Sequence, residues 1–149
     1  MGRIAPPPLD LARLVRGLME LDYDAIEAFR AAVARLGEDA DRRQLAQLMD
    51  DHHRHVTDLA PHLYVLGEEA PRPGGLRPGL PQGQVAGGGR LDDKRILAAL
   101  KTNEDDTVTA YERVAGHPDA TAELRDVLER NLADERRHRA WLVERMEAM

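Results

Sequence analysis

A segment rich in glycine and proline, residues 67–90, divides the chain into two halves. It holds eight of the 12 glycines and four of the nine prolines. Such a composition predicts a linker and not a helix or strand. On either side, apolar residues recur every three or four positions, which is typical of helices. The chain is therefore expected to fold as two helical units joined by one long connection.

Each half predicts two helices separated by a few residues. Gly37 is expected to end the first helix and Gly67 the second. Asp41 is expected to cap the second helix, and Pro61 to kink it or end it early. Within a single domain of residues 1–149, the predicted helices span about 9–36, 41–66, 91–115 and 119–149.

The lengths of the connections predict how these helices are arranged. Short connections make each pair an antiparallel hairpin. A helix of 25 residues is about 37 Å long, whereas 24 extended residues reach about 80 Å. Because the linker can cross the whole molecule, we expect an all-α four-helix bundle whose two antiparallel hairpins are joined by a long Gly/Pro-rich crossover.

Composition limits the chemistry and the partners. The chain has 149 residues, a net charge of −6 and no cysteine. Disulfides and cysteine-ligated metal sites are thereby excluded, so a metal site would use His, Asp or Glu. The negative charge argues against a nucleic-acid partner. The sequence has neither an apolar run of about 18 residues nor a signal pattern, so we expect a cytoplasmic protein without a membrane partner.

Polar residues interrupt the apolar seam of each predicted helix near its mid-length. Read at heptad spacing, the seams are otherwise almost entirely apolar. The six residues that interrupt them are Asp22, His52, His55, Glu104, Glu135 and His138. Antiparallel pairing within each hairpin brings Asp22 level with His52, and Glu104 within about one turn of Glu135. The six side chains are therefore predicted to lie in one buried layer.

The two halves of the chain also resemble each other. The stretch "DHHRH", residues 51–55, aligns with "DERRH", residues 134–138. The matched pairs are Asp22 with Glu104, Phe29 with Tyr111, Asp51 with Asp134, His52 with Glu135, Arg54 with Arg137, and His55 with His138. The match suggests two halves of one site.

A buried layer of carboxylates and imidazoles favours a metal site. An unpaired buried carboxylate costs several kcal/mol, and three of them at one level with three imidazoles need a strong compensating charge, which a divalent cation supplies. Glu135 and His138, three residues apart, share one helix face. One acid from each of two helices and Glu-x-x-His from the other two form the di-iron carboxylate pattern. His52 departs from it, because a bridging Glu is expected there. The alternative is a hydrogen-bonded polar layer that sets helix register without metal.

The remaining polar residues have other expected roles. Tyr111 and Phe29 are assigned to the core, with the Tyr111 hydroxyl a candidate to support the site. Glu27 and His62 are weaker ligand candidates. The residues expected on a solvated face are Asp50, Asp51, His53, Asp134 and Arg136.

Four stretches carry a resemblance to a known family: "LMELDYDAIEAFRAA", "DHHRH", "LKTNEDDTVTAYERV" and "LERNLADERRHRAWL". Over nearly its whole length the chain resembles the ferritin-like superfamily and, more narrowly, is similar to bacterial ferritin-like proteins of the PA2169/DUF2383 type. The resemblance implies a four-helix bundle that assembles as a homodimer or higher homo-oligomer. The superfamily's ligand motif carries over at Glu104, Glu135 and His138, and by position at Asp22 and His55. His52 departs from it in residue type, which leaves one or two metal ions open.

Two functions remain as alternatives. The first is a metal-binding protein that holds one or two divalent ions, iron first and manganese or zinc as alternatives, with oxidase or peroxide chemistry as its activity. The second is a non-catalytic helical module whose polar layer fixes helix register and whose outer face binds a partner.

Overall fold

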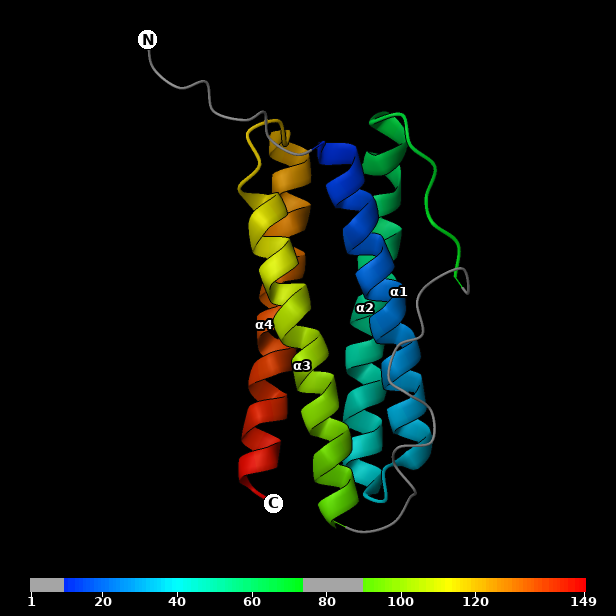
Figure 1. The fold of residues 1–149 in the computed structure, drawn as a ribbon, viewed down its shortest axis with the longest axis vertical. Helices are drawn as coiled ribbons and strands as arrows, with labels where there is room; N and C mark the ends of the chain where they lie inside the picture. Colours follow the sequence, from blue (N-terminus) through cyan, green and yellow to red (C-terminus); the bar gives the residue numbers. More distant parts are fainter. Residues whose placement is uncertain (1–9, 74–89) are drawn as a thin grey trace.

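The computed structural model describes residues 10–73 and 90–149, which form a bundle of long helices (Figure 1). The four helices are α1 (Leu11–Arg35), α2 (Asp39–Val65), α3 (Arg90–Ala115) and α4 (Ala122–Glu147). Each lies within a few residues of its predicted span. The all-α four-helix architecture predicted from the sequence is therefore confirmed.

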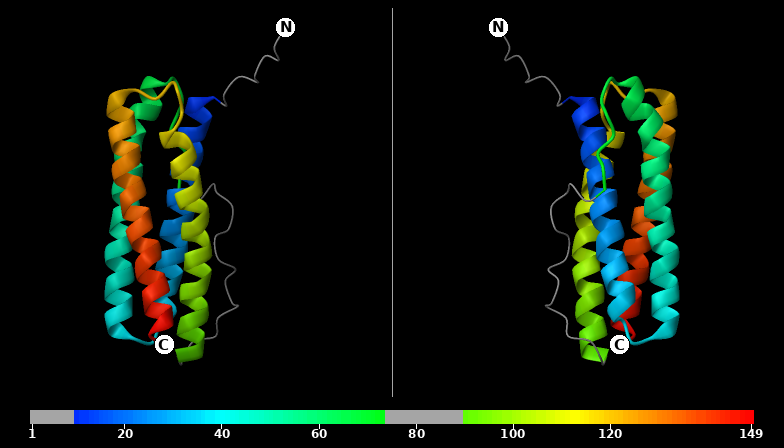
Figure 2. Two further views of the ribbon diagram at one scale, coloured as in Figure 1. Left: turned by 90° about the vertical axis from the view of Figure 1, so that its left-hand side faces the viewer. Right: turned by 90° about the vertical axis from the view of Figure 1, so that its right-hand side faces the viewer.

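The helices form two antiparallel hairpins, α1–α2 and α3–α4 (Figures 1 and 2). Helices α2 and α3 run in the same direction, so the end of α2 and the start of α3 lie at opposite ends of the bundle. Each helix packs against two neighbours: α1 against α2 and α3, and α4 against α3 and α2. The linker was predicted for residues 67–90. Its residues 74–89 lie outside the described part of the chain, whereas residue Glu69 accepts a hydrogen bond of 2.7 Å from Arg16 of α1.

The start of α2 differs from the prediction. Asp41 was expected to be the N-cap, but α2 begins at Asp39 and its N-cap residue is Glu38. Asp41 is buried in the first turn, where Arg145 of α4 donates a hydrogen bond of 2.8 Å to its carboxylate. The prediction was wrong because this pairing between helices takes the carboxylate that a cap would use. Asp10 of α1 and Thr121 of α4 do cap their helices through their side chains.

The end of α2 also differs in part. Pro61 was expected to kink the helix or end it early, but α2 continues to Val65. Leu59 and Leu63, on either side of the proline, are fully buried, so core packing holds the helix together despite one missing N–H donor. The helix ends at Val65 with Leu66 as its C-cap, and Gly67, which was predicted to stop it, follows with a φ of 87° that favours glycine.

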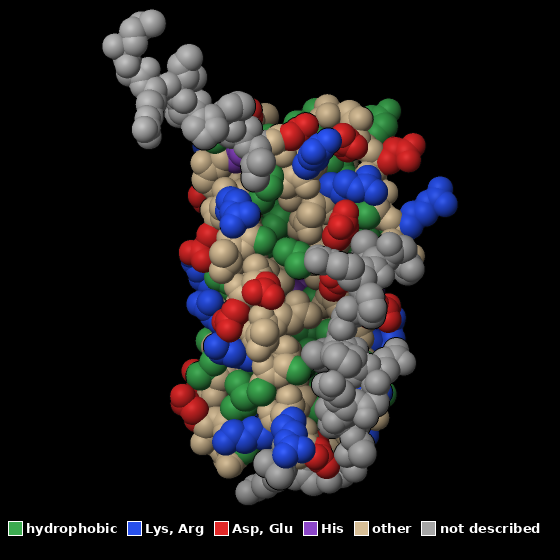
Figure 3. Space-filling model, viewed as in Figure 1, with side chains coloured by type: hydrophobic (Ala, Val, Ile, Leu, Met, Phe, Trp, Pro, Cys, Tyr) green, Lys and Arg blue, Asp and Glu red, His purple; other side chains and the backbone are tan. Residues whose placement is uncertain are grey.

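The core consists of two apolar clusters, one in each half of the bundle's length. One contains Leu18, Leu59, Tyr111 and Leu128, and the other contains Phe29, Leu45, Leu48, Leu97, Leu100 and Leu142. Charged side chains are spread over the face of the molecule seen in Figure 3, and hydrophobic ones form a short run in the upper half of that view. Within residues 10–73 and 90–149, no helix combines the length and apolar character needed to cross a bilayer.

Candidate metal centre

All six residues predicted to interrupt the seams lie together between the two apolar clusters. α1 contributes Asp22, α2 contributes His52 and His55, α3 contributes Glu104, and α4 contributes Glu135 and His138. Each of the six is 0% exposed. Heptad spacing explains this placement, because a polar residue on the seam cannot leave the interior without rotating its whole helix.

The six side chains form two overlapping groups, each able to hold a metal ion. The first consists of Asp22, His52, His55 and Glu135, and the second of His52, Glu104, Glu135 and His138. Within each group the potential ligand atoms lie within 4.8 Å of one another. His52 and Glu135 belong to both. Four N and O ligands from buried side chains are a typical coordination set for a divalent transition metal.

His52 lies between the carboxylates of the two groups. Its Nδ1 is 2.8 Å from Asp22 Oδ1 and its Nε2 is 2.9 Å from Glu104 Oε1. Burial alone would lower the pKa of His52. The charges of Glu104 and Asp22, and the hydrogen bonds to them, outweigh burial and raise that pKa to about 10. Without metal, His52 is therefore an imidazolium that compensates two buried carboxylates.

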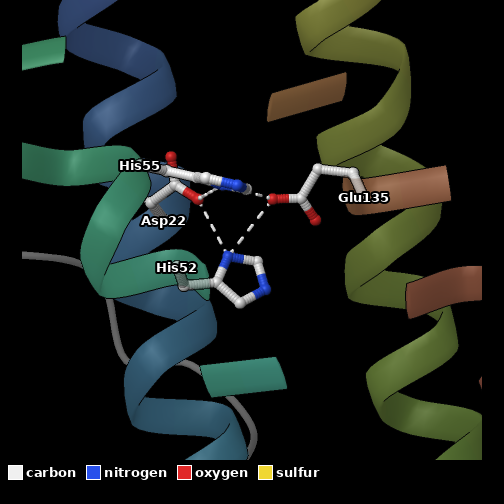
Figure 4. Close-up of side chains that lie close together, drawn as sticks. All are labelled: Asp22, His52, His55 and Glu135. Atoms are coloured by element: carbon white, nitrogen blue, oxygen red, sulfur yellow. Dashed lines mark hydrogen bonds and ion pairs between the residues drawn. The ribbon is translucent and has the colours of Figure 1, made fainter. Parts of the chain in front are cut away.

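The other two histidines direct Nδ1 toward the centre. His55 Nδ1 is 3.0 Å from Glu135 Oε1 and 3.2 Å from Asp22 Oδ1. Figure 4 shows that His52 and His55 turn their rings toward this same pair of carboxylates. His138 Nδ1 is 3.6 Å from Glu135 Oε2 and has no hydrogen-bond partner among the described residues.

The outer nitrogens of His55 and His138 contact carboxylates of the opposite helix. His55 Nε2 on α2 is 2.9 Å from Asp134 on α4, and His138 Nε2 on α4 is 2.8 Å from Asp51 on α2. A carboxylate that accepts the outer N–H leaves the inner nitrogen with a lone pair for a metal and fixes the orientation of the ring. The two contacts are equivalent under the sequence repeat.

Asp51 and Asp134 were predicted to lie on a solvated face, and the structure contradicts this prediction. Their side chains are only 16% exposed, and Arg54 and Arg137 each bind both of them. Burial would raise the pKa of both carboxyls, but the contacts with the histidines and arginines lower it. The prediction was wrong because it considered each helix alone. The signal was present in the repeat, which aligns these acids and arginines.

The structure also places the secondary candidates. Tyr111 is fully buried, and its hydroxyl donates a hydrogen bond of 2.6 Å to Asp22 Oδ2. Glu27 is exposed and pairs with Arg30, and His62 belongs to neither ligand group. Asp50, His53 and Arg136 are exposed, as predicted. Sequence reasoning assigned no role to Asn131, which is fully buried in α4, one turn before Glu135.

Several ligand atoms of the centre are buried without a hydrogen bond to any described residue. They are Glu104 Oε2, both carboxylate oxygens of Glu135, and His138 Nδ1. Burial raises the pKa of Glu135 well above its ordinary value, and the neighbouring charge of Glu104 raises it further. The pKa of Glu104 is lowered, because the charge of His52 and the hydrogen bond with it outweigh the effect of burial. Buried polar atoms are rarely unpaired in native proteins. The ligand atoms of Glu104, Glu135 and His138 converge on one small volume, which suits a bound cation.

The comparisons with known proteins bear on the fold and not on the candidate metal centre. No protein-family model matches the chain, and no curated protein matches it. In fold it is similar to the crystal structure of a conserved hypothetical protein, rv2844, from Mycobacterium tuberculosis. The two share 16% sequence identity with a TM-score of 0.76, over 93% of this chain and 98% of that one. At this identity the likeness supports the fold alone.

Proposed function

We propose that this protein binds a divalent transition metal ion, iron or manganese with zinc as an alternative, in the middle of its helical bundle. The observation that carries the proposal is the orientation of His55 and His138. Each directs Nδ1 toward a buried set of carboxylates, while its Nε2 contacts Asp134 or Asp51. This is the arrangement by which proteins orient histidine ligands.

Charge supports the same proposal. The inner layer contains three carboxylates, those of Asp22, Glu104 and Glu135, all fully buried. His52 supplies one compensating charge in the absence of metal. The outer acids Asp51 and Asp134 are already neutralised by two arginines. The inner layer therefore retains an excess of acid that a divalent cation would offset.

The overlap of the two ligand groups supports a site for one or two ions. Glu135 belongs to both groups and has both oxygens free of hydrogen bonds to described residues, as a bridging carboxylate would. His52 also belongs to both, where the ferritin-like pattern has a bridging Glu. Three carboxylates are one fewer than two divalent ions would need for neutrality. Iron or manganese held by such ligands would support oxidase or peroxide chemistry. Membership of the ferritin-like superfamily and a homo-oligomeric assembly both stay predictions.

A second candidate function is a helical module whose polar layer fixes register without metal. The observation that favours it is His52, whose two nitrogens are both satisfied by carboxylates at 2.8 and 2.9 Å. Glu104 Oε2, Glu135 Oε2 and His138 Nδ1 form no hydrogen bond to a described residue, which argues against it, because a layer built only for register would satisfy them.

The deciding experiment is metal analysis of the full chain. The purified protein is assayed by elemental analysis without added metal, then stripped with a chelator and titrated with Fe(II), Mn(II) and Zn(II) under anaerobic conditions. We expect at least one ion per chain. Glu135→Ala should reduce bound metal to near zero while circular dichroism shows retained helix. Glu129→Ala, on the exposed face of α4, is the matched control. A parent protein that takes up no metal, or Glu135→Ala with full metal content, would refute the proposal.

A further inference from the structure

Asn131 is a buried polar side chain whose amide has hydrogen-bonding capacity to spare. It is 0% exposed, and neither its amide oxygen nor its amide nitrogen has a hydrogen-bond partner among the described residues. Such a group costs stability unless something binds it. Asn131 precedes Glu135 by four residues, so the two side chains share one face of α4. Burial and the charge of Asp22 raise the pKa of the Tyr111 hydroxyl well above 10, and the interaction of that hydroxyl with the Asn131 amide opposes the rise.

In the sequence repeat, the polar side chains of Tyr111 and Asn131 have apolar partners, so the two sides of the centre differ. The repeat partner of Tyr111 is Phe29, and the position equivalent to Asn131 is Leu48. Phe29 packs edge-on against His52, with ring centroids 5.2 Å apart. Leu48 is buried in the apolar cluster that contains Phe29. On that side the centre is therefore closed by hydrocarbon.

On the other side the same two positions present hydrogen-bonding groups. Tyr111 lies against His55, with ring centroids 5.9 Å apart, and its hydroxyl binds Asp22. Asp22 and His55 both belong to the first ligand group. The ligand sets of the two halves are alike, but among the described residues only the first has hydrogen-bonding side chains at these two positions.

We propose that Asn131 and Tyr111 form a binding site for a small exchangeable oxygen or nitrogen donor, such as water or a triatomic anion, beside the ion held by Asp22 and His55. The proposal rests on the metal-binding function proposed above. An amide offers both a donor and an acceptor, so it can bind such a molecule whichever way it is oriented. Because Asn131 and Tyr111 are fully buried, the site would exclude larger ligands. A metal site that reacts needs such an open position, whereas a structural site is closed.

The test uses the full chain loaded with Co(II), whose visible absorption reports its ligands, and azide as the small donor. Azide is titrated into the parent, Asn131→Leu, Tyr111→Phe and the control Leu48→Met. Cobalt per chain is counted in each. We expect azide to change the parent spectrum. In Asn131→Leu, where the amide is replaced by the residue of the other half, the dissociation constant should rise at least about tenfold. Tyr111→Phe should weaken azide by several-fold, and Leu48→Met should match the parent.

A second measurement does not depend on azide. Thermal melts of the metal-free proteins should show Asn131→Leu at least as stable as the parent, because an unpaired amide is replaced by an apolar group of similar size. Unchanged azide affinity in Asn131→Leu and Tyr111→Phe, with cobalt content retained, would overturn the site. So would a cobalt-loaded parent that does not respond to azide. A parent that binds no cobalt would instead refute the metal centre itself.

Discussion

Replacing Glu135 by glutamine should stabilise the metal-free protein and abolish its metal binding. Burial, with the charges of Glu104 and Asp22, raises the pKa of Glu135 well above 4.5. A carboxyl that folds in its protonated form costs about 1.4 kcal/mol for each pH unit above its unfolded pKa. At pH 7 this cost reaches up to about 3 kcal/mol. It is fully absent below pH 4.5 and grows as the pH rises toward the folded pKa.

Glutamine is a neutral side chain of the same shape, so Glu135→Gln avoids this cost. Its amide can donate to the unpaired Oε2 of Glu104, as a protonated carboxyl would. At pH 7 the metal-free variant should therefore gain up to about 3 kcal/mol, or roughly 6–12 °C in Tm for a chain of this size. At pH 5 the gain should fall below about 1 kcal/mol. Circular dichroism melts of chelator-treated protein at both pH values measure it.

Added metal should stabilise the parent but not Glu135→Gln. An ion present at 100 times its dissociation constant stabilises the folded parent by about 2.7 kcal/mol, and the variant should lose this gain. Glu129→Gln, an exposed change on the same helix, should alter neither quantity. The reasoning would be refuted if Glu135→Gln melted below the parent at pH 7 without metal, or if its stability gain were the same at pH 5. Retention of the metal-dependent shift would show that Glu135 is not a ligand.

The same centre gives four further predictions. Asp51→Asn and Asp134→Asn should each weaken metal binding by about 10–100-fold without changing the number of ions per chain, whereas the exposed Asp50→Asn should bind as the parent does in the same titration. His52→Glu should raise the number of ions counted per chain, because a fourth carboxylate makes the charge of two divalent ions neutral. It should lower the Tm of the metal-free protein, because the added carboxylate repels its neighbours when no ion is present. A variant that binds no more metal than the parent and is also less stable would disprove this. Metal affinity should rise with pH, because His52, with a pKa of about 10, and Glu135 must lose protons to bind. The stability of the metal-free protein should fall between pH 7 and 10. The raised pKa of His52 stabilises the fold fully below the unfolded pKa of 6.5, and this stabilisation is lost as the pH rises through the folded pKa of about 10. Thermal melts that show no decline across this range would contradict the calculation.

Hydrophobic spacing and connection length were enough to predict the bundle and the membership of the buried layer. A seam read every three or four residues identifies the stripe of each helix that faces the core, since burial of that stripe stabilises a helix of this length. Asp22 and Glu104 stand on that stripe with apolar residues above and below them. The short connections then determine their height relative to the histidines and Glu135. Local information therefore sufficed for the helices, the hairpins and the layer of six.

What the sequence by itself could not determine is how the flanks of different helices meet. Asp51 and Asp134 stand beside the seam, where a residue faces solvent or a neighbouring helix according to how closely α2 and α4 pack. Only the tertiary structure shows that each acid contacts the opposite helix's histidine and so turns its Nδ1 inward. Tertiary packing also explains why α2 continues past Pro61, because burial of Leu63 outweighs the local effect of the proline. Periodicity along one helix determines which residues are buried, whereas the partners of those residues depend on the separation and rotation of helices far apart in the chain.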